Sequence, residues 1–517
     1  MASSAAVEQT RQGHRDPLPV LSAFDGLGAD LHAGDTPPRN PSDNSLAVGP
    51  DHIVQTVNSQ VAIFTKQGAR FDTSGRLLYG PVPTNTFFAG HGDVCGSRPN
   101  GDAVVRYDQL ARRWLVVMPI FRRAVPASRP GEALAPVARP GDAARAGQAS
   151  DPGAAARPAS PPAPPATAPG APAPTDGSYA MCYAISATDD PLGEYYRYVF
   201  DRPLFPDYPR PAVWSDGYYL PTSTGDEVIE KHVCIAERAK MIAGQPAAEQ
   251  CLMIGGVNFL NTSDLDGQTL PPPGAPNIVM ATGGTQLHYD LDDDGIYAWQ
   301  VHVDWRHPSQ TSIVGPRKIE VAPYRYLCGG QLTSCVPQPG AERRLDAQGD
   351  KMMARLVYRN VEGHESLVAV HSVDTAAGGG GVRWYEFRLD GQRHPVLHQQ
   401  GTFAPDASYR WMASPAIDRA GNIVIGYSVG DAANFPGQRF AARLATDPKG
   451  LLTFRESVLA NGEAAQTTTL RWEDYTQTAM DPADDCTVWY VGDYLKAGAA
   501  SYSTRIGAVQ VPGCITR

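Results

Sequence analysis

The stretch Gly101–Phe121, GDAVVRYDQLARRWLVVMPIF, contains the pattern that decides the fold. An aspartate comes first, and a short apolar strand, a turn and a second apolar strand follow it. The same order returns in SDNSLAVGPDHIVQTVNS, PDYPRPAVWSDGYYLPTS, GDKMMARLVYRNVEGHESLVAVHSV and EDYTQTAMDPADDCTVWYVGD. The aspartates that head these five copies are Asp43, Asp102, Asp207, Asp350 and Asp474.

Repeats of this form favour a β-propeller. A sixth copy, YRWMASPAIDRAGNIVIGYSV, has Arg410 where the others have aspartate, and DLDDDGIYAWQVHVDW resembles half of a seventh. Each propeller blade is a four-stranded antiparallel sheet whose innermost strand lines a channel, so residues that start these strands share one rim. A β-sandwich with Asp in its turns is the alternative, but six similar copies are hard to place in one. We therefore predict one all-β, single-propeller domain, with seven blades favoured over six.

The composition of this 517-residue chain argues against some classes of binding partner. The net charge of −10 comes from scattered acidic groups, and the absence of a Lys/Arg-rich stripe argues against nucleic acid. No apolar run reaches 18 residues, which predicts no membrane span. The residues after Met1 show no apolar signal region, so export would require a leader that the given chain does not contain. We expect a monomer.

Eight cysteines predict a disulfide-stabilised protein of an oxidising compartment, extracellular or periplasmic. Eight cysteines allow 105 connectivities, and proximity in sequence suggests one of them. Eight free buried thiols in a cytosolic protein are the alternative. The suggested pairs are Cys95–Cys182, Cys234–Cys251, Cys328–Cys335 and Cys486–Cys514.

One low-complexity tract interrupts the pattern. Residues 124–176 are rich in Ala and Pro and cannot bury a core, so we expect them to be disordered or polyproline-like. The tract separates Trp114–Phe121 from Tyr179–Ile185, two segments that resemble hairpin partners. We therefore assign residues 1–39 to an N-terminal extension and 40–517 to the propeller, with 124–176 as an insertion.

Several segments resemble a widespread group of exported bacterial β-propeller proteins. They include SLAVGPDHIVQTVNSQVAIF, FPDYPRPAVWSDGYYL, RLDAQGDKMMARLVYRN, YRWMASPAIDRAGNIVIGYS and DPADDCTVWYVGDYL. The similarity runs from about residue 40 to the C-terminus and omits the insertion. It implies a propeller and export, and it supplies no catalytic residue.

The carboxylates at the predicted rim are the first candidates for chemistry. Like charges raise one another's pKa, so the cluster needs a hard cation such as Ca²⁺, neutralising arginines such as Arg410 and Arg106, or backbone N–H groups that each Asp caps. Asp350 and Asp474 are candidate catalytic carboxylates. Asp43, Asp102 and Asp207 are candidate substrate ligands.

A second cation site is predicted at DLDDDG, where Asp290, Asp292 and Asp294 alternate before a glycine. This spacing matches the first half of an EF-hand-like calcium loop. The bidentate Glu expected at loop position 12 is replaced by Val301, so the loop is not an EF-hand. An Asp-rich surface turn is the alternative.

Histidines and aromatic residues complete the candidate site. His91 and His371 are candidate acids or bases near the rim, although a strand histidine is more often structural. Aromatic rings beside carboxylates can stack on sugars, with packing between blades as the alternative. The candidate substrate-binding residues of this kind are Tyr208, Trp411, Trp472 and Tyr475, together with Arg410.

These features lead to two functional hypotheses. The first is an exported protein that binds a glycan at the channel mouth, with glycoside hydrolase or polysaccharide lyase activity if it is an enzyme. The second is a non-catalytic module that presents a rigid face to a protein partner, because fold alone does not choose between functions.

Overall fold

The computed structural model of the chain covers most of its length. The described residues are 4–34, 39–90, 94–124, 134–137, 178–202, 205–222, 230–257, 259–283, 294–330, 334–499 and 501–514.

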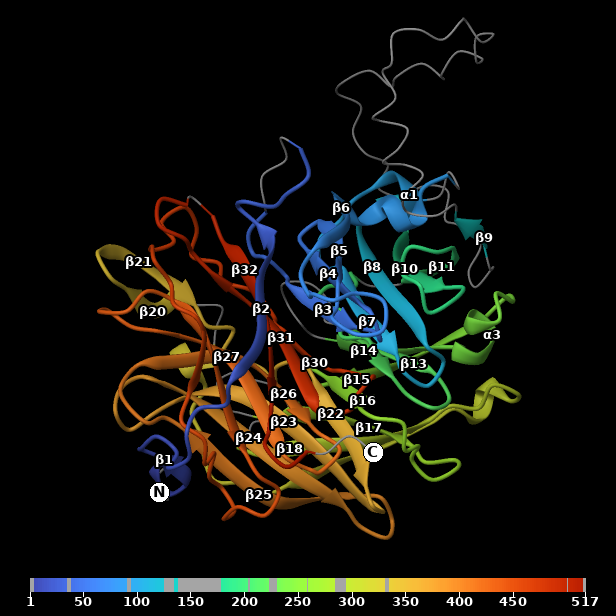
Figure 1. The fold of residues 1–517 in the computed structure, drawn as a ribbon. Helices are drawn as coiled ribbons and strands as arrows, with labels where there is room; N and C mark the ends of the chain where they lie inside the picture. Colours follow the sequence, from blue (N-terminus) through green and yellow to red (C-terminus); the bar gives the residue numbers. More distant parts are fainter. Residues whose placement is uncertain are drawn as a thin grey trace, which may run out of the picture.

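Within the described residues, the strands fall into seven consecutive units of four antiparallel strands (Figure 1). The first two units are β3 (Ser45–Val48), β4 (His52–Val57), β5 (Gln60–Thr65) and β6 (Leu77–Pro83), then β7 (Val104–Asp108), β8 (Arg113–Ala124), β10 (Ser178–Ser186) and β11 (Tyr195–Arg202). The next two are β12 (Ala212–Val213), β13 (Tyr218–Thr222), β14 (Glu230–Ala236) and β15 (Glu249–Gly255), then β16 (Asn261–Leu265), β17 (Asn277–Thr282), β18 (Ile296–His302) and β19 (Ser312–Ile319).

The last three units follow the same rule. They are β22 (Leu356–Val361), β23 (His364–Asp374), β24 (Gly380–Leu389) and β25 (Pro395–Phe403); β26 (Tyr409–Ile417), β27 (Ile423–Gly430), β28 (Gly437–Arg443) and β29 (Ser457–Ala460); and β30 (Gln477–Met480), β31 (Thr487–Tyr494) and β32 (Ser503–Gln510) with β2 (Val20–Gly28). The fourth and fifth units join into one larger sheet because β16 and β22 pair in parallel.

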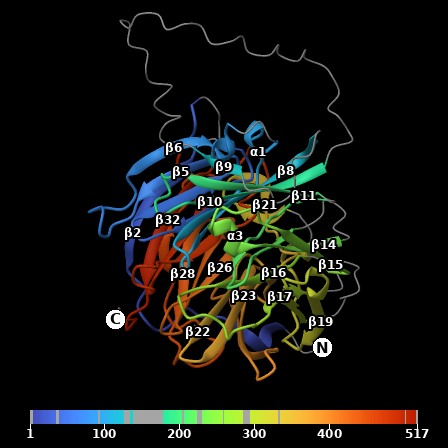
Figure 2. The same cartoon turned by 90° about the vertical axis from the view of Figure 1, so that its right-hand side faces the viewer.

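The first strands of the units form a closed ring. Each contacts the first strand of the next unit in chain order, from β3 through β7, β12, β16, β22 and β26 to β30, and β30 contacts β3 again. Figures 1 and 2 show the sheets fanning outward from this ring. A closed ring of radial antiparallel sheets is the architecture of a β-propeller, so the predicted fold class is confirmed.

The last unit is completed by the N-terminal segment. Strand β2 pairs antiparallel with β32 and forms the outer strand of the last unit. Further upstream, β1 (Glu8–Gln9) pairs in parallel with β25. Residues 1–39, assigned from the sequence to an extension, therefore contain the outer strand of the last unit.

The remaining elements are short. The helices are α1 (Val94–Ser97), α3 (Arg238–Ile242) and the 3₁₀ turns Ser4–Val7, Thr84–Phe88, Pro308–Gln310 and Leu327–Gly330, and a separate hairpin is made by β20 (Ser334–Gln338) and β21 (Ala341–Asp346). No described helix is long and apolar enough to span a membrane.

The core lies between neighbouring sheets. Strands β4, β5 and β31 are buried along their whole length, because each sheet packs on both faces. Burial on both faces explains why apolar residues stand next to one another in these strands instead of alternating strictly with polar ones. Large side chains such as Trp114, Trp214 and Trp384 are completely buried in these layers.

All eight cysteines are paired, and the connectivity is the one suggested by the sequence. The bonds are Cys95–Cys182, Cys234–Cys251, Cys328–Cys335 and Cys486–Cys514. The predicted hairpin partners either side of the Ala/Pro tract also pair, as β8 and β10. Most of the tract lies outside the described residues. Its one described piece, β9 (Leu134–Val137), pairs with β11, which the expectation of a wholly unstructured tract did not include.

Candidate functional site

Five predicted aspartates gather at the end of the channel where the inner strands begin. Asp43 and Asp102 precede β3 and β7, Asp474 precedes β30, and Asp207 and Asp350 lie before β12 and β22. Asp474 interacts electrostatically with Asp43, Asp102 and Asp207, although the strands that follow them belong to different units. We call these five residues, with Asp346, the acidic rim. The sequence prediction that the repeat aspartates share one rim is therefore met by the geometry.

Local backbone geometry explains part of the preference for aspartate. Asp43, Asp102 and Asp474 have φ angles of 46°, 59° and 76°, in the left-handed region. Asp and Asn enter this region more readily than other non-glycine residues. In the unit that contains β12 the left-handed residue is Tyr208, with φ 54°, one position after Asp207. A turn of this kind thus recurs at the start of inner strands.

Asp102 occupies the centre of a chain of three carboxyl groups. Its side chain is hydrogen-bonded to those of Asp43 and Asp207, and its backbone N–H lies 3.4 Å from Asp43 Oδ2. Burial, together with the charges of Asp43 and Asp207, holds the pKa of Asp102 well above its usual range. Burial also raises the pKa values of Asp43 and Asp207. The three carboxyl groups therefore hold their protons to a higher pH than isolated aspartates do.

Asp474 has a different environment, in which it faces donors. It forms an ion pair with Arg471 and accepts a hydrogen bond from Gln348 Nε2 at 2.7 Å. Arg471 also reaches Asp346 Oδ2, 2.9 Å from Nε. Burial and the charge of Asp474 raise the pKa of Asp346 to about 7. Asp474 is thus paired with a cation, whereas its neighbours Asp43, Asp102 and Asp207 are carboxyl groups whose pKa values burial raises.

A cluster of cations lies beside the acids, against aromatic faces. Lys351 Nζ lies 3.1 Å from Asp350 Oδ1, 4.0 Å from the centre of the Phe259 ring and 4.7 Å from that of Tyr208. The Arg210 guanidinium lies 4.2 Å from the Tyr208 ring. Burial lowers the pKa of Lys351, and the charge of Asp350 opposes this. Asp350 is therefore compensated by a lysine.

Tyr208 and Tyr475 are at the rim, but both are largely buried. Their rings meet edge to face with centroids 5.2 Å apart, and the Tyr208 hydroxyl donates to the carbonyl of Asp474. Burial raises the pKa of both hydroxyls far above the ordinary value. The two rings form a wall behind the acids. They do not provide an open surface on which a sugar could stack.

Three predicted substrate ligands have other roles. The Arg410 side chain, 2% exposed, donates to Asp406 at 2.8 and 2.9 Å and to Glu456 at 2.8 and 3.1 Å, so its donors are used by two carboxylates. Trp411 and Trp472 pack in the apolar core between sheets. The prediction that Arg410, Trp411 and Trp472 bind substrate is therefore corrected, because none of the three side chains is free to meet a ligand.

The predicted histidines do not supply a base among the described residues. His371 is completely buried, its Nε2 lies 2.9 Å from the Tyr385 hydroxyl, and its ring contacts Tyr324. Burial and Arg383 hold the pKa of His371 well below its usual value. This histidine is structural, and its assignment as a catalytic residue is corrected. His91 lies outside the described residues.

The calcium predictions meet few described residues. Asp290 and Asp292 lie outside them, and Asp294 Oδ2 accepts the backbone N–H of Tyr324 at 3.2 Å. Among the described residues, one group of potential ligand atoms lies within 4.8 Å, that of Cys234, Glu249 and Cys251, and its two sulfurs are joined in a disulfide. Calcium at the rim or at Asp290–Asp294 stays a prediction.

Polar contacts link neighbouring inner strands. Ser45 Oγ donates to Gln477 Oε1 at 2.7 Å, and Ser414 and Thr478 hydroxyls lie 3.1 Å apart. Arg355 Nη1 donates to the Thr478 carbonyl at 3.1 Å. Gln477 and Arg355 also line a cavity at the other end of the inner strands.

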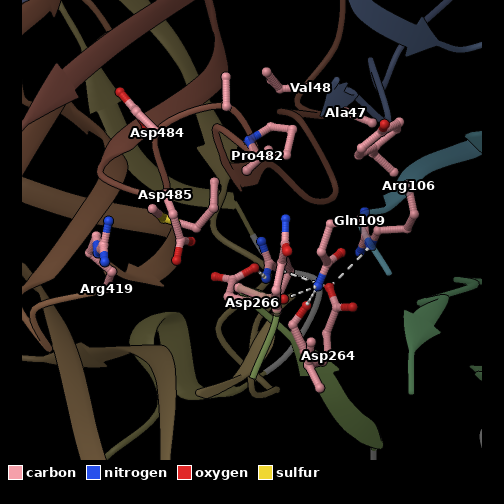
Figure 3. Close-up of a pocket in the computed structure, with 18 of the residues that line it drawn as sticks. Ala47, Val48, Arg106, Gln109, Asp264, Asp266, Arg419, Pro482, Asp484 and Asp485 are labelled. Atoms are coloured by element: carbon pink, nitrogen blue, oxygen red, sulfur yellow. Dashed lines mark hydrogen bonds and ion pairs between the residues drawn. The ribbon is translucent and has the colours of Figure 1, made fainter. Parts of the chain in front are cut away.

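A cavity of about 290 Å³ lies where the inner strands end (Figure 3). We call it the distal pocket. Figure 3 shows Arg106, Gln109, Asp264 and Asp266 on one side of it and Arg419, Asp484 and Asp485 on the other. The sequence did not predict most of these residues as part of a site. Arg106 was considered only as a cation that could neutralise the carboxylates of the rim. The signal was present, because Asp264 and Asp266 stand at the end of β16 and directly after it, and Asp484 and Asp485 stand in the turn after β30.

Comparisons with known proteins give little further direction. No family model matches the chain, and no curated protein matches it. Among solved structures, it is similar to a PL25 ulvan lyase bound to -[GlcA(1-4)Rha3S]-, with 10% identity, TM-score 0.38 and coverage of 97% of this chain and 96% of that chain.

Two other solved structures show weaker similarity. One is the WD40 domain of SCAP from fission yeast, with 9% identity, TM-score 0.32 and coverage of 90% and 81% of the two chains. The other is a GH43 β-1,3-galactosidase, with 10% identity, TM-score 0.28 and coverage of 96% and 93%. Similarities at this level carry no argument about function, and the propeller assignment rests on the strand pairings described above.

Proposed function

We propose that this chain is an exported β-propeller that binds a glycan at the acidic rim and cleaves it by hydrolysis. The observation that carries the proposal is the contrast between the carboxyl chain Asp43–Asp102–Asp207, in which burial raises the pKa values, and Asp474, which is paired with Arg471. Neighbouring carboxyl groups in such different environments are typical of acid–base catalysis. The four disulfides support export, since such bonds persist in oxidising compartments.

Asp207 and Asp474 are partly exposed residues of the acidic rim, whereas Asp43 is 1% exposed. Asp207 would donate its proton to the glycosidic oxygen as the bond to the anomeric carbon breaks. The Asp474 carboxylate would take a proton from the water that attacks this carbon. Asp102 would then return a proton to Asp207, and bulk solvent would restore the starting state.

The ionisable groups of the described rim favour hydrolysis over elimination. Elimination needs a base that removes a carbon-bound proton. His371 is buried, and the hydroxyls of Tyr208 and Tyr475 have strongly raised pKa values. A carboxylic acid beside a carboxylate is the pair that hydrolysis requires.

The test combines binding and turnover on a panel of neutral and acidic oligosaccharides. We expect at least one to raise the melting temperature and to release reducing ends. Asp207→Asn and Asp474→Asn should each lower kcat by about 10²–10⁴-fold, the usual contribution of a general acid or base, and should leave the fold intact. Asp216→Asn is the matched control, because Asp216 is also a partly exposed aspartate, with a pKa raised to about 6 by burial, but it lies in the turn after β12.

Two outcomes would reject the proposal. One is turnover that persists unchanged in both rim variants. The other is the absence of any glycan response together with a protein partner recovered in pull-down, which would favour the non-catalytic interaction module.

A further inference from the structure

The distal pocket takes no part in the proposed hydrolysis, yet several units build it. Its lining includes Val48 at the end of β3, Leu265 at the end of β16 and Met480 at the end of β30. Thr269 and Ala483 are exposed at its edge, so the cavity opens to solvent. The rim residues precede these strands, which places the pocket at the opposite end of the channel.

The charges at the pocket balance one another. Asp264 Oδ2 lies 2.8 Å from Arg355 Nε and 3.4 Å from Arg106 Nε, and Asp266 forms an ion pair with Arg355. Asp485 pairs with Arg359.

The remaining acid, Asp484, serves the local turn. Its carboxylate accepts the backbone N–H groups of Cys486 and Thr487, each at 2.9 Å. Three arginines line the pocket, namely Arg106, Arg355 and Arg419, and Arg359 pairs with Asp485 from outside the lining, so that four arginines in all stand against four aspartates. Charges balanced in this way favour a ligand with no net charge.

Two polar groups in this balanced lining are left without a partner. Asp266 is 6% exposed, and its Oδ2 is buried without a hydrogen bond although it lines the pocket. In the described part of the chain, the Arg419 guanidinium has neither a hydrogen bond nor an ion pair, while its backbone N–H donates to the Asp485 carbonyl at 3.0 Å. A buried acceptor without a donor is costly, so the site suits a ligand that supplies both donors and acceptors.

We propose that the distal pocket binds a small neutral polyol, and that a single monosaccharide unit is the class of ligand it takes. A hydroxyl group can donate to Asp266 Oδ2, and another can accept from Arg419, without adding charge to the balanced lining. The volume of about 290 Å³ lies just below the usual range for ligand pockets, which suits one sugar ring rather than an oligosaccharide. The inference is independent of hydrolysis at the rim, because it uses different residues.

The experiment is a titration of the full-length protein with free glucose, galactose, mannose and xylose, followed by ligand-observed NMR and calorimetry. Glucuronate and glutamate serve as charged comparators. We expect at least one neutral sugar to bind with a Kd in the millimolar range, as fits a ligand of about a dozen heavy atoms. Both charged comparators should bind more weakly.

Variants then locate the site. Arg419→Ala should weaken binding about tenfold, and Thr269→Trp should abolish it by filling the entrance while leaving the ion pairs untouched. Arg112→Ala is the matched control, since Arg112 is an exposed arginine paired with Asp189 at 2.6 Å on the surface. Asp207→Asn and Asp474→Asn should leave sugar binding unchanged, which separates this inference from the proposed hydrolysis.

The inference would be overturned by any of three results. These are no response to the four neutral sugars, binding that survives Thr269→Trp, and tighter binding of glucuronate or glutamate than of every neutral sugar.

Discussion

At the acidic rim, Asp43, Asp102 and Asp207 face one another, whereas at the distal pocket Asp264 and Asp266 both face Arg355. Both groups of acids are largely buried near the same channel. The acids of the pocket are ion-paired, whereas at the rim burial and neighbouring acids raise the pKa values of the carboxyl groups. Buried acids that lack cations have raised pKa values and are typical of functional sites, while paired acids serve equally well as structural links.

The variant with the largest expected effect tests the ion pairs at the distal pocket. Arg355→Leu leaves Asp264 and Asp266 without their main cation in a buried setting, and Arg106 alone cannot compensate both. We expect a loss of roughly 3–5 kcal/mol in the free energy of unfolding, the range for breaking a buried ion pair from one side. Urea denaturation measures it. The surface variant Arg112→Ala should cost less than about 1 kcal/mol; equal losses in the two variants would remove the distinction.

The second test concerns pH at the rim. The pKa of Asp346 is raised to about 7 in the folded protein, above its unfolded value. Its contribution to stability is therefore complete at low pH and is lost as the pH rises from about 4 through about 7. We expect Asp346→Asn to reduce the fall in unfolding free energy between pH 5 and pH 8 by on the order of 2 kcal/mol. A fall as steep as that of the wild type in this variant would contradict the assignment.

The third test asks whether the carboxyl chain is kept for function at the expense of stability. Asn tolerates the left-handed backbone of residue 102, where φ is 59°, and keeps an oxygen for the N–H of Tyr208. Asp102→Asn should therefore raise the unfolding free energy at pH 8 by about 1–2 kcal/mol, because no proton need be retained. It should also slow glycan hydrolysis. Thermal unfolding and reducing-end assays give both readouts, and a destabilised variant would count against the proposed repulsion.

The smallest expected effect concerns the turn that carries Asp266. Gly267 has φ +77°, and an added Cβ would lie 2.8 Å from Arg359 Nη2. We expect Gly267→Ala to cost about 1–2 kcal/mol through the left-handed conformation and this contact. It should weaken the binding of a neutral sugar in the distal pocket and leave rim chemistry unchanged. Full stability in the variant would show that the turn accepts a side chain.

The repeat pattern predicted the position of the rim residues better than it predicted their roles. Asp43, Asp102, Asp207, Asp350 and Asp474 come together because the start of an inner strand is an equivalent position in every blade. Arg410, at the head of its own copy, instead lies between Asp406 and Glu456. A strand start thus predicts position along the channel, and the partners of a side chain depend on loops that the pattern does not describe.

Sequence reasoning could identify the all-β propeller, the four disulfide pairs and the shared rim, because strand periodicity, cysteine proximity and repeat spacing are local features of the chain. Tertiary structure decided which acids have cations. Asp474 meets Arg471 nearby in sequence, but Asp264 meets Arg355 across 91 positions and Asp43 meets Asp102 across 59. It also decided that β2 completes the last unit and that a pocket forms beyond the inner strands. These outcomes depend on closing the ring, which brings together residues whose separation along the chain carries no signal of contact.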